Sequence, residues 1–270
     1  MTTTTPSGST VLLDVSAGIA TITLNRPETG NLFDHAMTEA FREAAATVAA
    51  DPAVRVVVLR GSGKAFCSGG DVEYFGAADD PAAALDGMAT NLHAGLLLLT
   101  ESAAPVVAVV RGAAFGAGLS LAAFADVVIA GSSAKFLGGY PGVGLTPDGG
   151  MTWNLTRKVG LTRATSLLFA GGMWRAGDAL AAGLVSEVVE DDELEAAATA
   201  RIEALAAGPT GAFAAIRRLL DEGTRRSFAD HLDVEKAQIV AQATSPEGRE
   251  GIEAFAARRT PRYAEIGTAS

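Results

Sequence analysis

The sequence predicts an α/β domain followed by a region made only of helices. Short runs rich in Val and Ile alternate with longer Ala-rich segments through residues 11–195, and this alternation is typical of strands covered by helices. From about Asp192 onward the chain is rich in Ala, Glu and Arg at helical spacing, with no clear strand. Its 270 residues are enough for one large domain with a helical appendage.

Six apolar runs predict the strands. β-branched side chains favour extended backbone, and nearly continuous apolar runs indicate strands that are buried on both faces. The first two runs are separated by Ser16, Ala17 and Gly18, which predicts a hairpin. The expected strands are residues 11–15, 19–24, 54–61, 105–110 and 126–131, with a weaker one at 185–189.

The Ala-rich segments between these runs have helical spacing. The expected helices are residues 37–50, 81–102, 118–124 and 151–168. Gly208 and Pro209 separate two further helices near the end of the chain. We therefore expect a disordered tail at residues 1–10, a core at 11–195, and a helical region at 196–270 that packs on the core or on another subunit.

Charge and composition exclude several kinds of partner and site. Lys and Arg total 21 against 31 Asp and Glu, a net charge of −10, so neither nucleic acid nor an anionic membrane is an expected partner. One cysteine, Cys67, and three separated histidines predict no disulfide and no metal site. The first residues lack the features of a secretory signal, and the longest uncharged apolar run, residues 112–125, is too short to span a bilayer. We expect a cytoplasmic protein.

Two expected strands run into glycine-rich turns, RGSGKAFCSGGD at 60–71 and RGAAFGAGLSLAAFAD at 111–126. The second resembles a dinucleotide-binding fingerprint only loosely, and Ala65 after Gly63-Lys64 excludes a P-loop. Two interpretations remain open from spacing alone. The glycines allow close packing of strand and helix, or the turns carry backbone N–H groups that converge on a developing oxyanion.

Five segments in order resemble the enoyl-CoA hydratase/isomerase (crotonase) superfamily. They are TLNRPETGNLFD at 23–34, GSGKAFCSGGDVEYF at 61–75, AAPVVAVVRGAAFGAGLSLAAFADVVIA at 103–130, LTPDGGMTWNLTRKVG at 145–160 and EGIEAFAARRTPRY at 250–263. The resemblance implies a spiral of ββα units with a C-terminal helical trimerisation region, assembled as a homotrimer or as a hexamer of two trimers. It also implies an acyl-CoA thioester as substrate, with coenzyme A as part of that substrate and no separate cofactor.

The same resemblance assigns roles to particular residues. The backbone N–H groups of Gly70 and Ala117 would hold the thioester oxygen when an enolate forms, and fixed donors stabilise that charge most in the transition state. The positions that the resemblance predicts to contact coenzyme A are Arg26, Ala65, Ser68, Gly70 and Asp71.

The chain departs from the family's hydratases at their two catalytic glutamates. Ser120 and Tyr140 stand at those positions, and neither hydroxyl is a good general base near neutral pH. Asp148, in the GLTPDGG stretch, matches an aspartate that performs acid–base or nucleophilic chemistry in some relatives, and the segment most resembles the epoxyphenylacetyl-CoA isomerase branch. The alternative for Asp148 is a turn residue that caps the following helix.

The leading hypothesis is therefore an enoyl-CoA isomerase, in which Asp148 shuttles a proton while Gly70 and Ala117 stabilise the enolate. A hydratase or an acyl-CoA hydrolase on the same scaffold is the first alternative. A catalytically weak acyl-CoA-binding subunit is the second.

Overall fold

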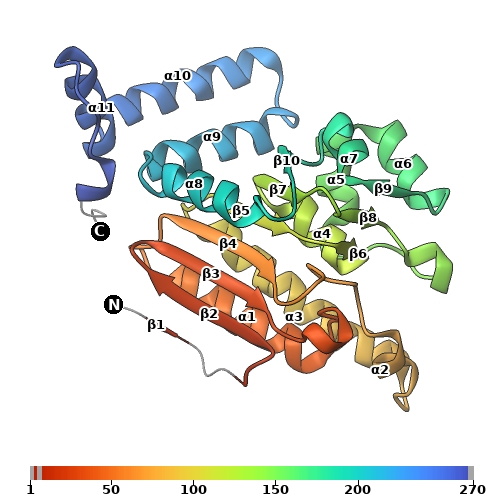
Figure 1. Ribbon diagram of the computed structural model, residues 1–270. Coiled ribbons are helices and arrows are strands. Elements are labelled where there is room, and N and C mark those ends of the chain that lie inside the picture. The colour runs from red at the N-terminus through yellow and green to blue at the C-terminus, as the bar shows by residue number, and fades with distance from the viewer. Residues whose placement is uncertain (1–2, 5–7, 267–270) are drawn as a thin grey trace.

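The computed structural model describes residues 3–4 and 8–266. Its main sheet has seven strands in the order β1-β2-β3-β4-β5-β7-β10, with helices on both faces (Figure 1). All six expected strands are present, with small differences at their ends. The strands are β1 (Thr3–Thr4), β2 (Val11–Ser16), β3 (Ile19–Leu24), β4 (Val56–Gly61), β5 (Val106–Val110), β7 (Val127–Gly131) and β10 (Glu187–Val189).

The predicted hairpin is confirmed. β2 and β3 pair antiparallel, with Val11 opposite Leu24, and both Ala17 and Gly18 adopt positive φ in the turn. From β3 onward every neighbouring pair in this sheet, β3–β4, β4–β5, β5–β7 and β7–β10, is parallel. Parallel strands place their carboxyl ends at one edge, so the two glycine-rich turns begin on the same side of the sheet.

Successive residues of β4 and β5 pack into two different cores, as the alternation of a strand requires. Val57, Leu59, Ala108 and Val110 belong to the larger core, which includes residues of α1 (His35–Ala50), α3 (Pro81–Glu101) and α4 (Ala117–Phe124). The other face contacts Leu194 and Ala198 of α8 (Leu194–Ala206) through Val56, Val58, Val107 and Val109. Burial on both faces explains why these runs are almost wholly apolar.

A second, three-stranded sheet was not predicted. It contains β6 (Ala113–Phe115), β8 (Lys135–Leu137) and β9 (Met173–Arg175), with β6 parallel to β8 and β8 antiparallel to β9. Three residues are too few to display an alternating pattern, so these strands carry no periodic signal in the sequence. β6 matters for the site because it lies between β5 and α4.

The helices of the core are α1 (His35–Ala50), α2 (Val72–Gly76), α3 (Pro81–Glu101), α4 (Ala117–Phe124), α5 (Met151–Val159), α6 (Leu161–Phe169) and α7 (Ala176–Ala182). The expectation of one helix over 151–168 is wrong. Gly160 lies between α5 and α6 with φ 80° and ψ 158°, a conformation outside the helical region that glycine adopts readily. Short 3₁₀ helices occur at Pro27–Thr29, Tyr140–Val143 and Tyr263–Glu265.

Helix α3 is long and apolar enough to cross a membrane by length and composition alone. In the structure it packs against α1, and Met88, Leu92, Gly95, Leu96 and Leu99 are buried on it. A side chain at Gly95 would lie 2.7 Å from the Phe41 ring. These contacts make α3 a core helix of the domain.

The last part of the chain is helical, as predicted. It contains α8 (Leu194–Ala206), α9 (Thr210–Gly223), α10 (Phe228–Thr244) and α11 (Pro246–Ala256). Figure 1 shows α10 and α11, in blue, extending away from the sheet. No residue of α10 is buried in the described chain, although Ile239 and Val240 are apolar and mostly exposed.

The expected disordered tail at residues 1–10 is only partly described. Thr3 and Thr4 form β1, which pairs antiparallel with Val15 and Asp14 of β2, so these two residues are an edge strand and differ from the expectation. Residues 1–2 and 5–7 lie outside the described residues.

Candidate active site

The two glycine-rich turns lie against each other in the structure. The Cys67 amide donates to the Ala113 carbonyl and the Phe115 amide donates to the Cys67 carbonyl, each over 2.9 Å. These bonds form a short parallel bridge between Cys67 and Ala114. The turn after β4 is therefore fastened to β6, directly before the start of α4.

Three glycines make this approach possible. A side chain at Gly118 would place its Cβ 2.2 Å from the Cys67 carbonyl oxygen, closer than any side chain can lie. Gly69 and Gly116 have φ values of 110° and 50°, which glycine adopts at little cost. The close-packing interpretation of these glycines is therefore correct, and the packing itself brings Gly70 and Ala117 to one cavity.

The amides of Gly70 and Ala117 are free donors among the hydrogen bonds of the described residues. Ala117 is the first residue of α4, and its N-cap residue Gly116 has no side chain to satisfy the first N–H groups. The amide end of a helix also carries partial positive charge. Both residues line a cavity of about 230 Å³, so their N–H groups are available to a negatively charged oxygen there.

The wall of this cavity is mostly apolar. Its largest apolar contributors are Phe33, Leu85, Met88, Leu92 and Leu145. They come from the segment before α1, from α3 and from the loop that follows Tyr140–Val143. Such a wall suits a hydrocarbon chain, because burying apolar surface is favourable by about 25 cal/mol per Å².

Asp148 lines the same cavity and does not cap a helix. The N-cap of α5 is Gly150, which makes no side-chain capping bond. The Asp148 carboxylate instead accepts a hydrogen bond at Oδ1 from the Tyr140 hydroxyl, over 2.6 Å. The carboxylate and the two free amides are thus on one cavity, as an acid–base group and an oxyanion site need to be.

Ser120 and Tyr140, which the resemblance places at the positions of the hydratase glutamates, both contact Asp148. The Ser120 hydroxyl donates to the Asp148 main-chain carbonyl over 2.9 Å and lies 3.3 Å from the Tyr140 hydroxyl. Ser120 is fully buried. Burial, together with the adjacent Asp148 charge, raises the pKa of Tyr140 far above its ordinary value of 10. Tyr140 therefore stays protonated and acts as a donor.

The turn that carries Asp148 has a third attachment. The Gly149 amide donates to His93 Nε2 on α3, over 3.0 Å. Gly149 and Gly150 both have positive φ, and a side chain at Gly149 would lie 2.9 Å from Ser120 Cβ. The sequence pattern Pro-Asp-Gly-Gly thus folds as the predicted turn, and that turn directs Asp148 to the cavity.

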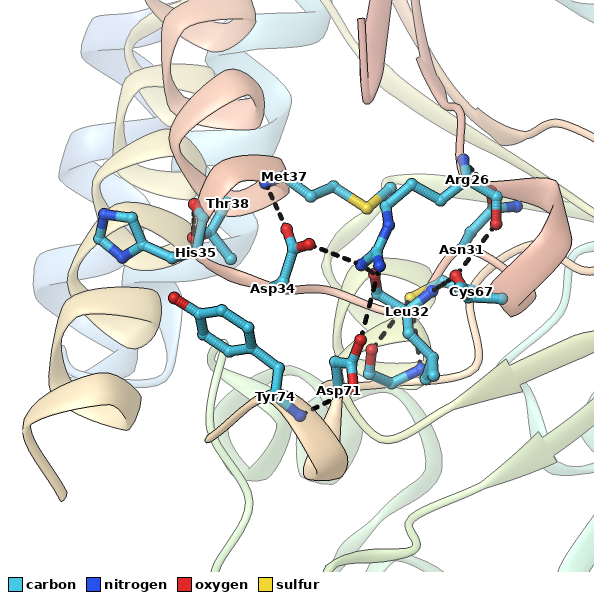
Figure 2. Close-up of polar contacts among 12 residues, drawn as sticks. Arg26, Asn31, Leu32, Asp34, His35, Met37, Thr38, Cys67, Asp71 and Tyr74 are labelled. Atoms are coloured by element: carbon cyan, nitrogen blue, oxygen red, sulfur yellow. Dashed lines mark hydrogen bonds and ion pairs between the residues drawn. The ribbon is translucent and has the colours of Figure 1, made fainter. Parts of the chain in front are cut away.

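Arg26 is held in an ion-pair cluster (Figure 2). Its guanidinium contacts Asp34 at 2.9 Å and Asp71 at 3.5 Å, and it donates to the Leu32 carbonyl. Asp71 also caps α2 by accepting from the Tyr74 amide. Neither Arg26 nor Asp71 lines the cavity of Gly70 and Ala117.

The other positions expected at coenzyme A lie in the turn before Gly70. The Ser68 amide donates to the Gly30 carbonyl over 3.0 Å, and the Ala65 carbonyl accepts from the Asn31 side chain over 2.8 Å. A contact between coenzyme A and any of Arg26, Ala65, Ser68, Gly70 or Asp71 stays a prediction.

The structural roles of two groups of residues were not predicted from the sequence. Asn31 is fully buried with φ 60°, and its side-chain amide donates to the carbonyls of Ser62 and Ala65, which fixes the turn leading to Gly70. His93 and Tyr140 hold the Asp148 turn. Position in the sequence was the only signal for these contacts. Asn31 ends the NRPETGN stretch, and Tyr140 lies eight residues before Asp148.

A larger cavity, of about 540 Å³, lies between α4, α5 and α9. Three of its charged groups, Arg217, Asp126 and Lys158, already have partners within the protein. Arg217 pairs with Asp126 at 3.3 Å, and the Lys158 ammonium donates to the Ala125 carbonyl over 2.7 Å. It contains neither free amide nor Asp148, so the smaller cavity is the candidate active site.

Comparison with known proteins agrees with this geometry. A family model described as enoyl-CoA hydratase/isomerase matches residues 14–266. A Rhodobacter capsulatus protein named "Probable enoyl-CoA hydratase" is 38% identical, covering 94% of this chain and 97% of that one. The 1,2-epoxyphenylacetyl-CoA isomerase of Escherichia coli K12 is 34% identical with the same coverages. A solved enoyl-CoA hydratase from Mycobacterium smegmatis is 31% identical, with a TM-score of 0.86 over 94% of this chain and 98% of that one. The chain therefore belongs to the enoyl-CoA hydratase/isomerase family and has the crotonase fold.

Proposed function

We propose that this enzyme is an enoyl-CoA isomerase that moves a carbon–carbon double bond through a thioester enolate. One observation carries the proposal: the Asp148 carboxylate shares a cavity with the two unbonded amides of Gly70 and Ala117. The positions of the hydratase glutamates hold Ser120 and a protonated Tyr140, which donate hydrogen bonds to Asp148.

The reaction follows from these groups. Asp148 takes a proton from C2 of a 3-enoyl thioester, and the electron pair of the C–H bond delocalises onto the thioester oxygen. The Gly70 and Ala117 amides stabilise that oxygen, and losing one such donor typically costs about 3 kcal/mol of the barrier. Asp148 then returns the proton to C4, which leaves the double bond between C2 and C3. No proton or electron is gained or lost, and no separate cofactor is needed.

Substrate binding divides between two parts of the fold. The apolar cavity wall of Phe33, Met88 and Leu92 receives the acyl chain, since these side chains lie beside Asp148. The turn of residues 65–71 is the site for the coenzyme A part, because it leads directly to the Gly70 amide. This arrangement places the thioester carbonyl between the two halves of the ligand and against the amides.

The helical tail supports an oligomer of this chain, a homotrimer or a pair of trimers. Ile239 is 70% exposed on α10 and Phe255 is 87% exposed on α11. Apolar side chains this exposed, on helices that extend from the core, are typical of surfaces that another subunit covers.

A hydratase is the second candidate, since the Rhodobacter relative carries that name. Hydration needs a base that activates water. Tyr140 and Ser120 act as hydrogen-bond donors to Asp148, so Asp148 would have to activate the water alone. The isomerase needs only one base and is therefore preferred.

One assay distinguishes the isomerase from the hydratase. The protein is incubated with 3-enoyl-, 2-enoyl- and ring-oxepin-CoA thioesters, and double-bond position and water addition are followed for wild type, Asp148→Asn and Asp192→Asn. We expect wild type and the exposed control Asp192→Asn to isomerise, and Asp148→Asn to be slower by roughly 10²–10⁴-fold. Water addition at equal rates in wild type and Asp148→Asn would overturn the mechanism. Stabilisation by CoA esters without any reaction would favour an acyl-CoA-binding subunit.

A further inference from the structure

Asp148 is attached to the surrounding fold at three different points. Tyr140 donates to its carboxylate, Ser120 donates to its main-chain carbonyl, and His93 accepts from the amide of the next residue, Gly149. The first attachment differs in kind from the other two. Only the Tyr140 bond reaches the group that would exchange protons, while the other two fix the backbone.

The Tyr140 bond also distinguishes the two carboxylate oxygens. Oδ1 accepts the Tyr140 hydroxyl over 2.6 Å, and no described residue donates to Oδ2. A hydrogen bond to a carboxylate oxygen stabilises the charged form and lowers the basicity of that oxygen. Oδ2 is therefore the oxygen that remains free to take and return a proton.

Tyr140 is suited to this role by its surroundings. Burial, and then the nearby carboxylate, keep its hydroxyl protonated, and Ser120 lies 3.3 Å from the same hydroxyl. Tyr140 also begins the 3₁₀ helix Tyr140–Val143, and its carbonyl accepts from the Leu145 amide over 3.0 Å. The loop from Tyr140 to Asp148 is thus closed at its base by the Tyr140–Asp148 bond.

We propose that Tyr140 is a positioning residue that orients Asp148, occupies Oδ1 and leaves Oδ2 as the single oxygen through which the proton is removed and returned. This inference rests on the proposed isomerase function. It assigns a task to one of the two positions at which the chain lacks a hydratase glutamate.

The proposal is tested by Tyr140→Phe, with Ser120→Ala and Tyr263→Phe as controls. Ser120→Ala removes the bond to the Asp148 main chain and the 3.3 Å contact with the Tyr140 hydroxyl, but not the Tyr140–Asp148 bond itself. Tyr263 lies outside the cavity lining. Isomerisation of a 3-enoyl-CoA is measured as kcat and KM, together with the exchange of C2 deuterium into solvent.

We expect Tyr140→Phe to lower kcat by about tenfold, with KM nearly unchanged, because the Asp148 carboxylate is no longer held in one orientation. More of the C2 label should reach solvent, because Asp148 is less firmly held. Ser120→Ala keeps the carboxylate bond and should retain the C2 label as wild type does, and Tyr263→Phe should match wild type.

A second variant covers the case in which Tyr140→Phe fails to fold. Replacing Tyr140 with 3-fluorotyrosine keeps both the ring and the hydroxyl donor, so kcat and the retention of the C2 label should stay near those of wild type. An unchanged kcat and label exchange in Tyr140→Phe, or a tenfold loss of kcat in the fluorotyrosine protein, would overturn the inference. If Tyr140→Phe behaves like wild type while Asp148→Asn is inactive, only the role of Tyr140 is refuted. If Asp148→Asn keeps full activity, the proposed function itself is refuted.

Discussion

The guanidinium of Arg26 contacts Asp34 at 2.9 Å, and through the same group it reaches Asp71 at 3.5 Å. Asp34 caps α1 by accepting from the Met37 amide, and Asp71 caps α2. One cation therefore joins the starts of two helices that flank the glycine-rich turn before Gly70. The resemblance assigned Arg26 to coenzyme A, whereas its contacts assign it first to the framework of the site.

Arg26→Ala should lower the free energy of unfolding by about 1–3 kcal/mol, because it leaves two partly buried carboxylates without their cation. Arg26→Lys should recover only part of that loss, since one ammonium cannot copy the forked guanidinium. Denaturant titration measures the stability, and KM for an acyl-CoA is measured in parallel. A raised KM with unchanged stability would show that Arg26 serves coenzyme A and not the framework.

Gly118→Ala should destabilise the fold by about 2–4 kcal/mol, because its Cβ would overlap the Cys67 carbonyl and force the two turns apart. Gly142→Ala is the matched control, since nothing lies within 4 Å of its added Cβ. We expect the control to change stability by about 0.5 kcal/mol or less. Thermal melting of both variants is the measurement, and equal melting temperatures would contradict the close contact.

Acid should weaken the attachment of the chain end to α11. Glu250 accepts from the Arg259 guanidinium at 2.6 and 2.9 Å and from the Arg262 amide at 2.8 Å. The bonds from Arg259, and then the bond from the Arg262 amide, lower the pKa of Glu250 from 4.5 to about 2.

The direction of this pH effect follows from the pKa values of Glu250 in the unfolded and folded states. The unfolded carboxyl binds a proton more readily than the folded one, so the stabilisation is complete above about pH 4.5 and is lost as the pH falls towards about 2. Acid titration monitored by circular dichroism should show a shallower loss of stability in this window for Glu250→Gln than for wild type. Parallel curves for the two proteins would contradict the prediction.

The exposed apolar surface of the tail predicts an assembly that one charge can disrupt. Ile239→Asp on α10 should shift the protein from an oligomer to a monomer, because a carboxylate would be buried in the subunit contact. Lys236 lies on the same helix, where its exposed side chain pairs with Asp233. Lys236→Glu should therefore leave the assembly intact. Light scattering after size exclusion distinguishes the two, and a monomeric wild type at micromolar concentration would refute the oligomer.

The centre of the main sheet could be predicted because β4 and β5 are runs of five or six residues that are apolar on both faces. β4 and β5 display this clearly, since both faces of each strand pack against helices. β6, β8 and β9 have three residues each, and their pairing depends on partners distant in the chain. The break at Gly160 was also missed, because an isolated glycine is compatible with a continuous helix as well as with its end.

The candidate site was predictable in part for a similar reason. Gly70, Ala117 and Asp148 lie in long motifs whose order and spacing are specific. The contacts of Ser120, Tyr140 and His93 with the Asp148 turn depend on three segments meeting in space, so no local pattern encodes them. Spacing alone also left the role of Asp148 open. The structure removes the capping alternative, because Gly150 occupies the N-cap of α5.

The free donors at Gly70 and Ala117 are main-chain groups, so the steric demands of the site fall on neighbouring positions. Any residue except proline at position 117 still presents an N–H there, so a change of that side chain need not remove the function. The neighbouring Gly118 tolerates no side chain, since the Cys67 carbonyl occupies the space. Substitution is therefore expected to do most harm at a position without a reactive side chain, and a search for reactive side chains would pass over it.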